Sequence, residues 1–283
     1  KNLREKCMDE LKFSEEQADA IKTIHKYCLD HLTNRSVFTK EFKRDFKSKL
    51  KIDPSNWRFI DGDFSISEED CVGWSEVEDK KLGTIFKLIG YARHKLINDT
   101  QEMIKFAHDS DNLNFARLKD SEIEWVYESY LKYKKANTLI DFEDMLSRAL
   151  PDSIVFQNYD TVMVDEAQDL TDLEWAIIDK IAKKSNNLYL VGDDDQAIYG
   201  WKGSEVSKFQ TWPCDEKDVR FLKKSYRLPT NIHHFVTTEI LPEIHTRMGN
   251  TYTSSGKGHG SIYTLNDIER LKGMIPLPDL NLC

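Results

Sequence analysis

The sequence predicts an α/β protein that combines a parallel sheet with a separate, nearly all-helical stretch. Two short apolar runs, residues 160–167 (DTVMVDEA) and 187–195 (NLYLVGDDD), each end in acidic residues, and an amphipathic stretch at 171–184 lies between them. Strand, helix and strand at this spacing are typical of a βαβ unit with parallel strands. Residues 34–137, in contrast, carry apolar residues at helical spacing over much of their length.

Composition and charge indicate a globular, charge-rich chain. Of the 283 residues, 40% are hydrophobic and 31% are charged, and no run of about 18 apolar residues predicts a membrane span. The length allows two modest domains, or one domain with an insertion. The net charge of -9 argues mildly against a nucleic-acid ligand, although an acidic protein can still carry a local basic groove.

The cysteines and the N-terminal residues favour a cytosolic setting. The five cysteines are scattered, with no CxxC pair and no Cys/His spacing that suits zinc, so reduced thiols are expected. Residues 1–11 (KNLREKCMDEL) are charged and lack the apolar core of a signal peptide.

The first 32 residues are predicted to be helical, with Ser14 as an N-cap and Gln17 completing a capping box. Residues 34–50 are basic and carry phenylalanines four residues apart, which predicts either a solvated amphipathic helix or a face that contacts phosphates. Residues 52–66 are predicted to be a loop. The stretches 74–97 and 119–139 are predicted to be long helices.

Adjacent acids, Asp165 and Glu166, close the first apolar run. Ligands of parallel sheets bind beyond the carboxyl ends of the strands, where these acids are expected. Asp165 suits Mg²⁺, which takes oxygen ligands beside nucleotide phosphates, and Glu166 suits a base that polarises an attacking water. The pattern is that of a Walker B strand. The alternative is that the acids end this strand by chance, or cap the next helix.

A second group of polar and aromatic residues follows the next strand. Gln196 suits a hydrogen bond to a γ-phosphate or to the attacking water, and Lys202 suits a phosphate contact. Tyr199 and Trp201 offer stacking surfaces to unpaired bases. The alternative for these aromatic residues is packing in a core or an interface.

Arg227 precedes Pro229 in the stretch LKKSYRLPTNI, where a helix is predicted to begin. An arginine at this point suits a contact with a phosphate across a domain boundary, as an arginine finger makes. The alternative is a structural ion pair with a carboxylate.

Three of these segments, in this order and spacing, resemble motifs II, III and IV of the superfamily 1 DNA helicases of the UvrD/Rep/PcrA type. They are VDEAQD (164–169), GDDDQAIYGWKG (192–203) and KKSYRLP (223–229). Two weaker matches support the resemblance. IKTIHKYC (21–28) is similar to motif Ib, and LIDFEDML (139–146) is similar to the DF-x-D-L segment that precedes motif II.

The resemblance implies a RecA-like P-loop ATPase sheet with a large helical insertion, plus the start of a second RecA-like domain. ATP would lie between the two domains, and single-stranded DNA would run across both. The expected domain limits are 1–33 for part of the first RecA-like domain, 34–137 for the insertion, 138–220 for the remainder of the first domain, and 221–283 for the beginning of the second.

The resemblance also implies roles for the residues that match the motifs. Asp165 corresponds to the Mg²⁺ ligand and Glu166 to the catalytic base. Gln196 and Arg227 correspond to the residues that sense the γ-phosphate of ATP and contribute to catalysis.

The DNA-binding positions implied by the resemblance come from motifs Ib and III. They are Thr23, His25, Tyr199, Trp201 and Lys202. Lys202 stands where the family more often has arginine, which weakens any bidentate pairing there.

One expected motif is missing from the 283 residues, because no G-x-x-x-x-G-K-[ST] phosphate-binding loop occurs. Motifs V and VI are also missing, and residues 1–11 resemble the tail of motif Ia. We therefore expect an internal portion of a longer helicase, which alone neither hydrolyses ATP nor unwinds DNA. Natural loss of catalysis is the alternative.

The function expected is that of the central portion of an ATP-dependent DNA helicase or translocase, with ATP and Mg²⁺ as cofactors. The partner expected is single-stranded DNA, or a duplex with a single-stranded tail, and no membrane is expected. The family implies movement from 3′ to 5′ in a bacterial cytoplasm, in a bacterial or phage-encoded protein. The alternatives are a non-catalytic nucleic-acid-binding or scaffold protein and, less favoured, a two-metal nuclease built on the same acids.

Overall fold

The computed structural model describes residues 3–33, 36, 80–110, 112–249, 251–256, 258 and 260–262. They fall into two compact units, one within residues 1–193 and 197–209, the other within 194–196 and 210–283. The predicted limit between domains at 220/221 lies eleven residues after the main change of unit, and the domain limits stay a prediction. The basic stretch 34–50 and the loop 52–66 lie outside the described residues, apart from Ser36.

The elements are named in chain order. The α-helices are α1 (Leu3–Leu11), α2 (Glu15–Asp19), α3 (Ile24–Asp30), α5 (Lys80–His94), α6 (Thr100–Asp109), α7 (Leu113–Ala116), α8 (Asp120–Ala136), α9 (Phe142–Ser147), α10 (Asp172–Ala182), α11 (Val206–Gln210) and α12 (Thr230–Phe235). The strands are β1 (Tyr159–Val164), β2 (Ser185–Leu190), β3 (Lys224–Ser225) and β4 (Thr253–Ser254). Short turns of helix are η1 (Ala167–Asp169), η2 (Asp194–Gln196), η3 (Gly200–Lys202), η4 (Glu216–Asp218), η5 (Val236–Ile240) and η6 (Leu241–Glu243).

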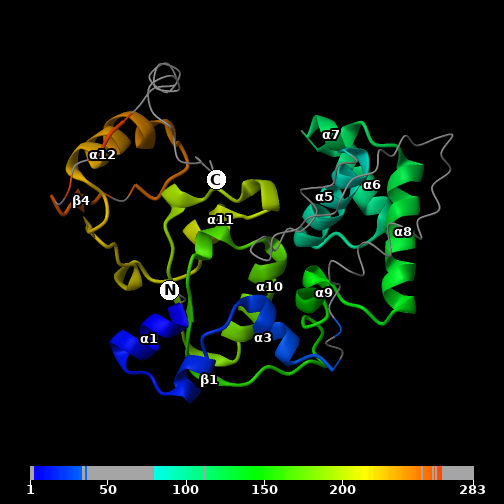
Figure 1. Ribbon diagram of the computed structural model, residues 1–283, viewed down its shortest axis with the longest axis horizontal. Helices are drawn as coiled ribbons and strands as arrows, with labels where there is room; N and C mark the ends of the chain where they lie inside the picture. Colours follow the sequence, from blue (N-terminus) through cyan, green and yellow to red (C-terminus); the bar gives the residue numbers. More distant parts are fainter. Residues whose placement is uncertain are drawn as a thin grey trace, which may run out of the picture. The chain divides into compact units, whose positions relative to one another are not determined.

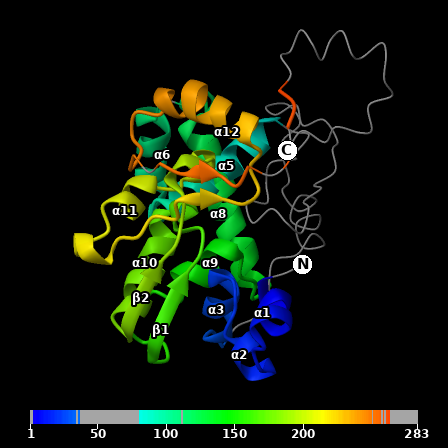
Figure 2. The same ribbon diagram turned by 90° about the vertical axis from the view of Figure 1, so that its left-hand side faces the viewer.

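The predicted βαβ unit is confirmed. Strands β1 and β2 run parallel, with Val162 opposite Leu188 and Val164 opposite Leu190, and Figure 2 shows the two arrows side by side with the same direction. These four side chains are half-buried, whereas Met163 on the other face of the sheet is 74% exposed. The alternation of burial follows from the two-residue period of a strand.

Helix α10 connects the two strands and covers the sheet face that carries the half-buried residues. Thr171 caps its N-terminus, because the threonine hydroxyl accepts from the backbone N–H of Glu174 while the Glu174 carboxylate accepts from the backbone N–H of Thr171. Leu173, Trp175 and Ile178 are buried on the helix. The capping box and the apolar face together account for a helix at this place in the sequence.

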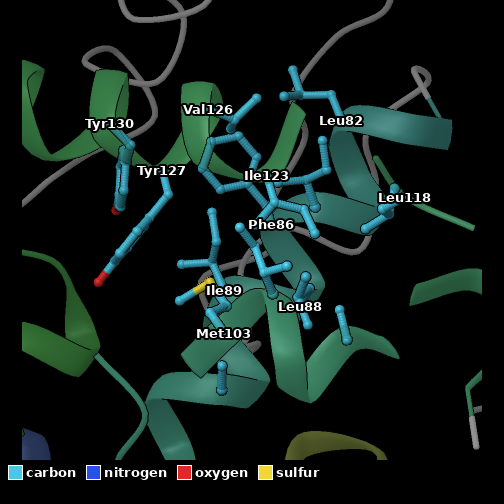
Figure 3. Close-up of a cluster of buried hydrophobic side chains, with 14 of the residues drawn as sticks. Leu82, Phe86, Leu88, Ile89, Met103, Leu118, Ile123, Val126, Tyr127 and Tyr130 are labelled. Carbon is cyan, nitrogen blue, oxygen red and sulfur yellow. The ribbon is translucent and has the colours of Figure 1, made fainter. Parts of the chain in front are cut away.

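The helices α5 to α8 gather around a hydrophobic core of their own (Figure 1). Figure 3 shows side chains of these helices pointing toward one another, with the hydroxyl groups of Tyr127 and Tyr130 at the edge of the cluster. Phe86 and Tyr130 meet edge to face, with their ring centroids 5.4 Å apart. The described part of the predicted insertion is therefore helical, as its periodicity predicted.

The N-terminal residues differ from the continuous helical pattern that was predicted. The capping box of Ser14 and Gln17 is confirmed, but helix α2 ends at Asp19 and a new helix begins at Ile24. Thr23 causes the second start, because its hydroxyl accepts a hydrogen bond from the backbone N–H of Lys26 at 3.2 Å. An N-cap threonine accepts from a free N–H group at the start of a new helix. The apolar spacing continues across the break, so periodicity alone does not show where the second helix begins.

A buried polar network joins α5, α8 and the start of α9. The guanidinium of Arg93 lies 2.8 Å from Asp141 Oδ2 and 2.6 Å from Asp144 Oδ1. Lys134 Nζ lies 2.8 Å from Asp144 Oδ2 and also contacts Asp141. Burial, followed by the charge of Asp141, raises the pKa of Glu143 at the same place to about 7. The acids of the DF-x-D-L segment thus bind one cation of α5 and one of α8.

The described part of the second unit contains a short parallel pair of strands, the α-helix α12 and the short turns η2, η4, η5 and η6. Strand β3 pairs with β4, and α12 begins at Thr230 after Pro229, as the proline predicted. His233 Nε2 lies 2.7 Å from the carbonyl oxygen of Tyr252, which ties α12 to the segment before β4. None of the helices in the described parts of the chain is both long and apolar enough to cross a membrane.

Candidate functional site

The loops that follow β1 and β2 are joined by backbone hydrogen bonds. The N–H of Val191 donates to the carbonyl of Val164 at 2.8 Å, and the N–H of Ala167 donates to the carbonyl of Val191 at 2.9 Å. The carboxyl ends of the two strands therefore meet at one edge of the sheet. This is the edge at which ligands of parallel sheets bind.

The acid pair lies at this edge and is exposed. The backbone N–H of Glu166 donates to Asp165 Oδ1 at 3.1 Å. Glu166 adopts a left-handed backbone conformation, with φ 53° and ψ 42°. This conformation costs a residue other than glycine about 1 kcal/mol, and such strain gathers at functional sites. The backbone thus turns sharply at the residue predicted to be the catalytic base.

Gln168 is a site residue that the sequence interpretation missed. Its side chain is 1% exposed, and its Nε2 donates to Glu166 Oε2 at 2.8 Å. Its Oε1 accepts from the backbone N–H of Asp193 at 3.0 Å. Gln168 therefore connects the predicted base to the loop after β2. The only signal in the sequence was a glutamine two residues after the acid pair.

A third acid of the same loop, Asp169, adds to the negative charge at this edge. Burial, followed by the charge of Glu166, raises the pKa of Asp169, although Lys202 opposes the shift. Clustered carboxylates of this kind favour a cation or a cationic partner nearby.

Gly192 allows the close approach of the two loops. A Cβ atom at this position would lie 2.5 Å from Gln168 Oε1, 3.1 Å from the ring of Phe209 and 3.3 Å from the backbone nitrogen of Ala167. The packing at this edge therefore requires a residue without a side chain between the two loops.

Gly192→Ala is expected to destabilise the chain by about 1–3 kcal/mol, because the added methyl group overpacks the contact between the two loops. Urea unfolding of the 283-residue chain measures the change. Gly200→Ala is the matched control, since a Cβ at Gly200 has no heavy atom within 4 Å and should change stability by less than about 0.5 kcal/mol. Equal stabilities of the two variants would contradict the close packing of the loops.

Two aromatic residues of the motif III segment are available to a ligand. Trp201 is 58% exposed, and its ring centroid lies 6.1 Å from that of Tyr199, which is also exposed. Gly203 ends the turn with a φ of +96°, and a Cβ at this position would lie 3.6 Å from Cβ of His94 and 3.7 Å from the ring of Tyr91, both on helix α5. An exposed tryptophan beside a tyrosine offers two flat surfaces for stacking.

Two of the predicted DNA contacts have side chains in an interior polar cluster. Lys202 Nζ lies 3.5 Å from Oε1 of the buried Glu174, and His25 is 8% exposed. Burial lowers the pKa of His25, and it lowers the pKa of His94 to about 4. Burial would raise the pKa of Glu174, but Lys202 and the backbone N–H of Thr171 outweigh it, so the pKa is lowered.

Thr23, His25 and Lys202 consequently have clear structural contacts of their own. The Thr23 hydroxyl is exposed and caps α3, and the His25 ring meets the ring of Phe142 edge to face, at 5.6 Å between centroids. Binding of these three residues to DNA stays a prediction. The capping box Thr171-x-x-Glu174 is the sequence signal from which the buried acid beside Lys202 could have been found.

The remaining predicted residues belong to the second unit. Gln196 ends η2 and is exposed, and its neighbour Asp195 accepts two hydrogen bonds from the guanidinium of Arg247, at 2.7 and 2.6 Å. Arg227 is exposed in the bend between β3 and α12, and no ion pair found within the described ranges involves it. The predicted roles of Gln196 and Arg227 at a phosphate stay predictions.

The exposed carboxylate of Asp165 fits Mg²⁺ better than it fits a metal held only by protein. Within the residues that the structure describes, no three histidine, cysteine, aspartate or glutamate side chains gather around a possible metal position. Mg²⁺ needs only one or two carboxylates when nucleotide phosphates and waters complete its coordination. Asp165 can supply one of these ligands, whereas the 283 residues supply no G-x-x-x-x-G-K-[ST] loop for the phosphates.

Comparison with known proteins gives a consistent result. Residues 1–216 match the family described as the UvrD/REP helicase N-terminal domain. The chain is 28% identical over 190 residues to the ATP-dependent DNA helicase PcrA of Leuconostoc citreum, across 64% of this chain and 24% of that protein. It is 30% identical over 165 residues to DNA helicase II of Haemophilus influenzae, across 53% of this chain and 23% of that protein.

A longer match extends into the second unit. The chain is 25% identical over 231 residues to the probable DNA helicase II homolog of Mycoplasma genitalium, across 75% of this chain and 30% of that protein. In these three comparisons the match covers between 23% and 30% of the relative's length.

Proposed function

The chain belongs to the UvrD/REP helicase family, and we propose that it supplies the acidic strand edge and the DNA-stacking residues of an ATP-driven motor on single-stranded DNA. The observation that carries the proposal is the junction of the loops after β1 and β2. Backbone hydrogen bonds and the side chain of Gln168 hold the acid pair beside the loop that leads to Gln196. Such an arrangement suits a nucleotide whose γ-phosphate is contacted by residues of both loops.

In this proposal Asp165 contributes one oxygen ligand to Mg²⁺, which neutralises charge on the phosphates when bound. Glu166 accepts a proton from the water that attacks the γ-phosphorus of ATP. Gln196 and Arg227 contact the γ-phosphate. The exposure of all four side chains at loop positions supports these roles, because each can meet a ligand without unfolding of its surroundings.

On the DNA side, Tyr199 and Trp201 stack on unpaired bases, and their exposure supports this role. Thr23, His25 and Lys202 lie in motifs Ib and III and would border the path of the strand, Thr23 from an exposed position and His25 and Lys202 from the buried cluster beside it. We also propose that both units are RecA-like and that the motor moves from 3′ to 5′ along DNA. This chain would be the central portion of a bacterial cytoplasmic protein.

A non-catalytic DNA-binding or scaffold protein is the second candidate, because the 283 residues contain no G-x-x-x-x-G-K-[ST] loop. The sequence that precedes Lys1 in the reading frame separates the two. A phosphate-binding loop there favours the motor, and its absence from the complete reading frame favours the scaffold.

Trp201→Ala is expected to weaken binding of the chain to a fluorescent oligo(dT) by about 5- to 150-fold, because one base–aromatic stack is worth about 1–3 kcal/mol. Fluorescence anisotropy at a fixed salt concentration measures the dissociation constant. Tyr189→Ala is the matched control, since Tyr189 is an exposed aromatic residue on β2. Equal losses of affinity in both variants, or none in either, would contradict the proposed DNA contact.

A further inference from the structure

The side chain of Gln168 bonds to the exposed Glu166 and to one backbone amide, and it also opposes the rise in the pKa of the neighbouring Asp169. Its amide is buried, whereas the carboxylate that it contacts belongs to the exposed Glu166. The orientation of the amide follows from its two partners. Oε1 faces the N–H donor of Asp193 and Nε2 faces Oε2 of Glu166, so the reverse orientation would oppose donor to donor and acceptor to acceptor.

Stability accounts for the bond of Oε1 to the backbone N–H of Asp193, which joins the two loops, but it does not account for the bond of Nε2 to Glu166. A hydrogen bond to an exposed carboxylate adds little to folding, because water would solvate the carboxylate equally well. An apolar residue of the same length would fill the interior space next to Gly192 without a buried amide. The polar group is better explained by what it does to Glu166, whose long side chain would otherwise sample several rotamers in solvent.

We propose that Gln168 is a positioning residue, which holds the Glu166 carboxylate in the orientation that accepts a proton from the attacking water. This inference rests on the proposed function of Glu166 as the base. The bond of Gln168 to the N–H of Asp193 gives the orientation a second determinant. A shift of the loop after β2 would move Asp193, and with it the side-chain amide of Gln168, so that the Glu166 carboxylate loses its bond to Gln168. The orientation of the Glu166 carboxylate thereby depends on the segment that leads to Gln196.

The first arm of the test uses the 283-residue chain and the variant Gln168→Met, which keeps the length of the side chain and removes both hydrogen bonds. Hydrogen exchange at the Asp193 amide is expected to be at least 10-fold faster in the variant. The midpoint of urea unfolding is expected to fall moderately, because the backbone N–H of Asp193 loses its bond to Gln168, while the chain stays folded. Gln101→Met, at an exposed glutamine of α6, is the control for the substitution itself. Unchanged exchange at Asp193 would overturn the bridge.

The second arm uses the polypeptide encoded by the complete reading frame and measures ATP hydrolysis with single-stranded DNA. Gln168→Met is expected to lower kcat by 10- to 100-fold, while KM for ATP changes by less than 2-fold. In the Glu166→Gln background the same substitution should lower kcat by less than 2-fold further, because the group that it positions is already inactive. A purely structural role would give multiplicative losses, and these would overturn the proposal.

The outcomes separate this inference from the function on which it rests. Normal turnover in Gln168→Met together with loss of turnover in Glu166→Gln overturns the positioning role alone. Unchanged turnover in Glu166→Gln overturns the proposed function itself. If Gln168→Met fails to fold, Gln168→Asn serves in its place, because its side chain is one methylene too short to reach both partners. Wild-type kcat in that variant would overturn the proposal.

Discussion

Glu166→Gln is expected to lower ATP turnover of the polypeptide encoded by the complete reading frame by about 10²- to 10⁴-fold, which is the usual contribution of a general base. Glutamine keeps the shape of the side chain and cannot accept the proton of the attacking water. Asp165, which is proposed to hold Mg²⁺, is unchanged. Binding of Mg²⁺-ATP should therefore remain within a few-fold of the wild type.

Phosphate release in the presence of single-stranded DNA measures turnover, and titration with a fluorescent ATP analogue measures binding. Glu124→Gln, at an exposed position of α8, is the matched control and should hydrolyse ATP at the wild-type rate. Wild-type turnover in Glu166→Gln would contradict the assignment of the base. The same assay on the 283-residue chain is expected to give no turnover, and turnover that disappears in Glu166→Gln would contradict that expectation.

Arg93→Met is expected to destabilise the chain by about 3–5 kcal/mol, the usual effect of breaking a buried ion pair from one side. The guanidinium is 4% exposed and lies within 4 Å of carboxylates of Asp141, Glu143 and Asp144. Without the Arg93 guanidinium, the only ion pair of Asp141 among the described residues is the one with Lys134. The pKa of Arg93 is raised, because these carboxylates outweigh the effect of burial.

Urea unfolding of the 283-residue chain, followed by far-ultraviolet circular dichroism, measures this loss of stability. Arg117→Met is the matched control, because Arg117 is exposed at the end of α7 and should contribute less than about 0.5 kcal/mol. A loss in Arg93→Met no larger than that in Arg117→Met would contradict the network that joins α5 and α8 to the DF-x-D-L segment.

Local patterns were sufficient to predict the parallel unit around β1 and β2. The apolar runs, the acids at their ends and the capping box of Thr171 are all contained in about 35 consecutive residues, so neighbours along the chain determine the result. The break between α2 and α3 was missed for a related reason. Apolar periodicity continues across it, and only the cap at Thr23 marks a new helix.

The contacts that local patterns do not predict, in the site and in the network of Arg93, join residues far apart in the sequence. Gln168 meets Asp193 across 25 positions, and Arg93 meets Asp144 across 51. Such pairs are determined by the packing of whole elements, and no local pattern predicts them. The position of the Lys202 side chain beside the buried Glu174 shows the same limit, and the phosphate contact of Lys202 stays a prediction.

The proposed function depends on a nucleotide that lies at the joined carboxyl ends of β1 and β2. The most direct test is a crystal structure of the polypeptide encoded by the complete reading frame, with Mg²⁺ and a non-hydrolysable ATP analogue. We expect Mg²⁺ to contact Asp165, directly at about 2.1 Å or through one water, with Glu166 facing the γ-phosphate. A nucleotide bound elsewhere, or an acid pair turned away from it, would contradict the assignment of this edge as the motor site.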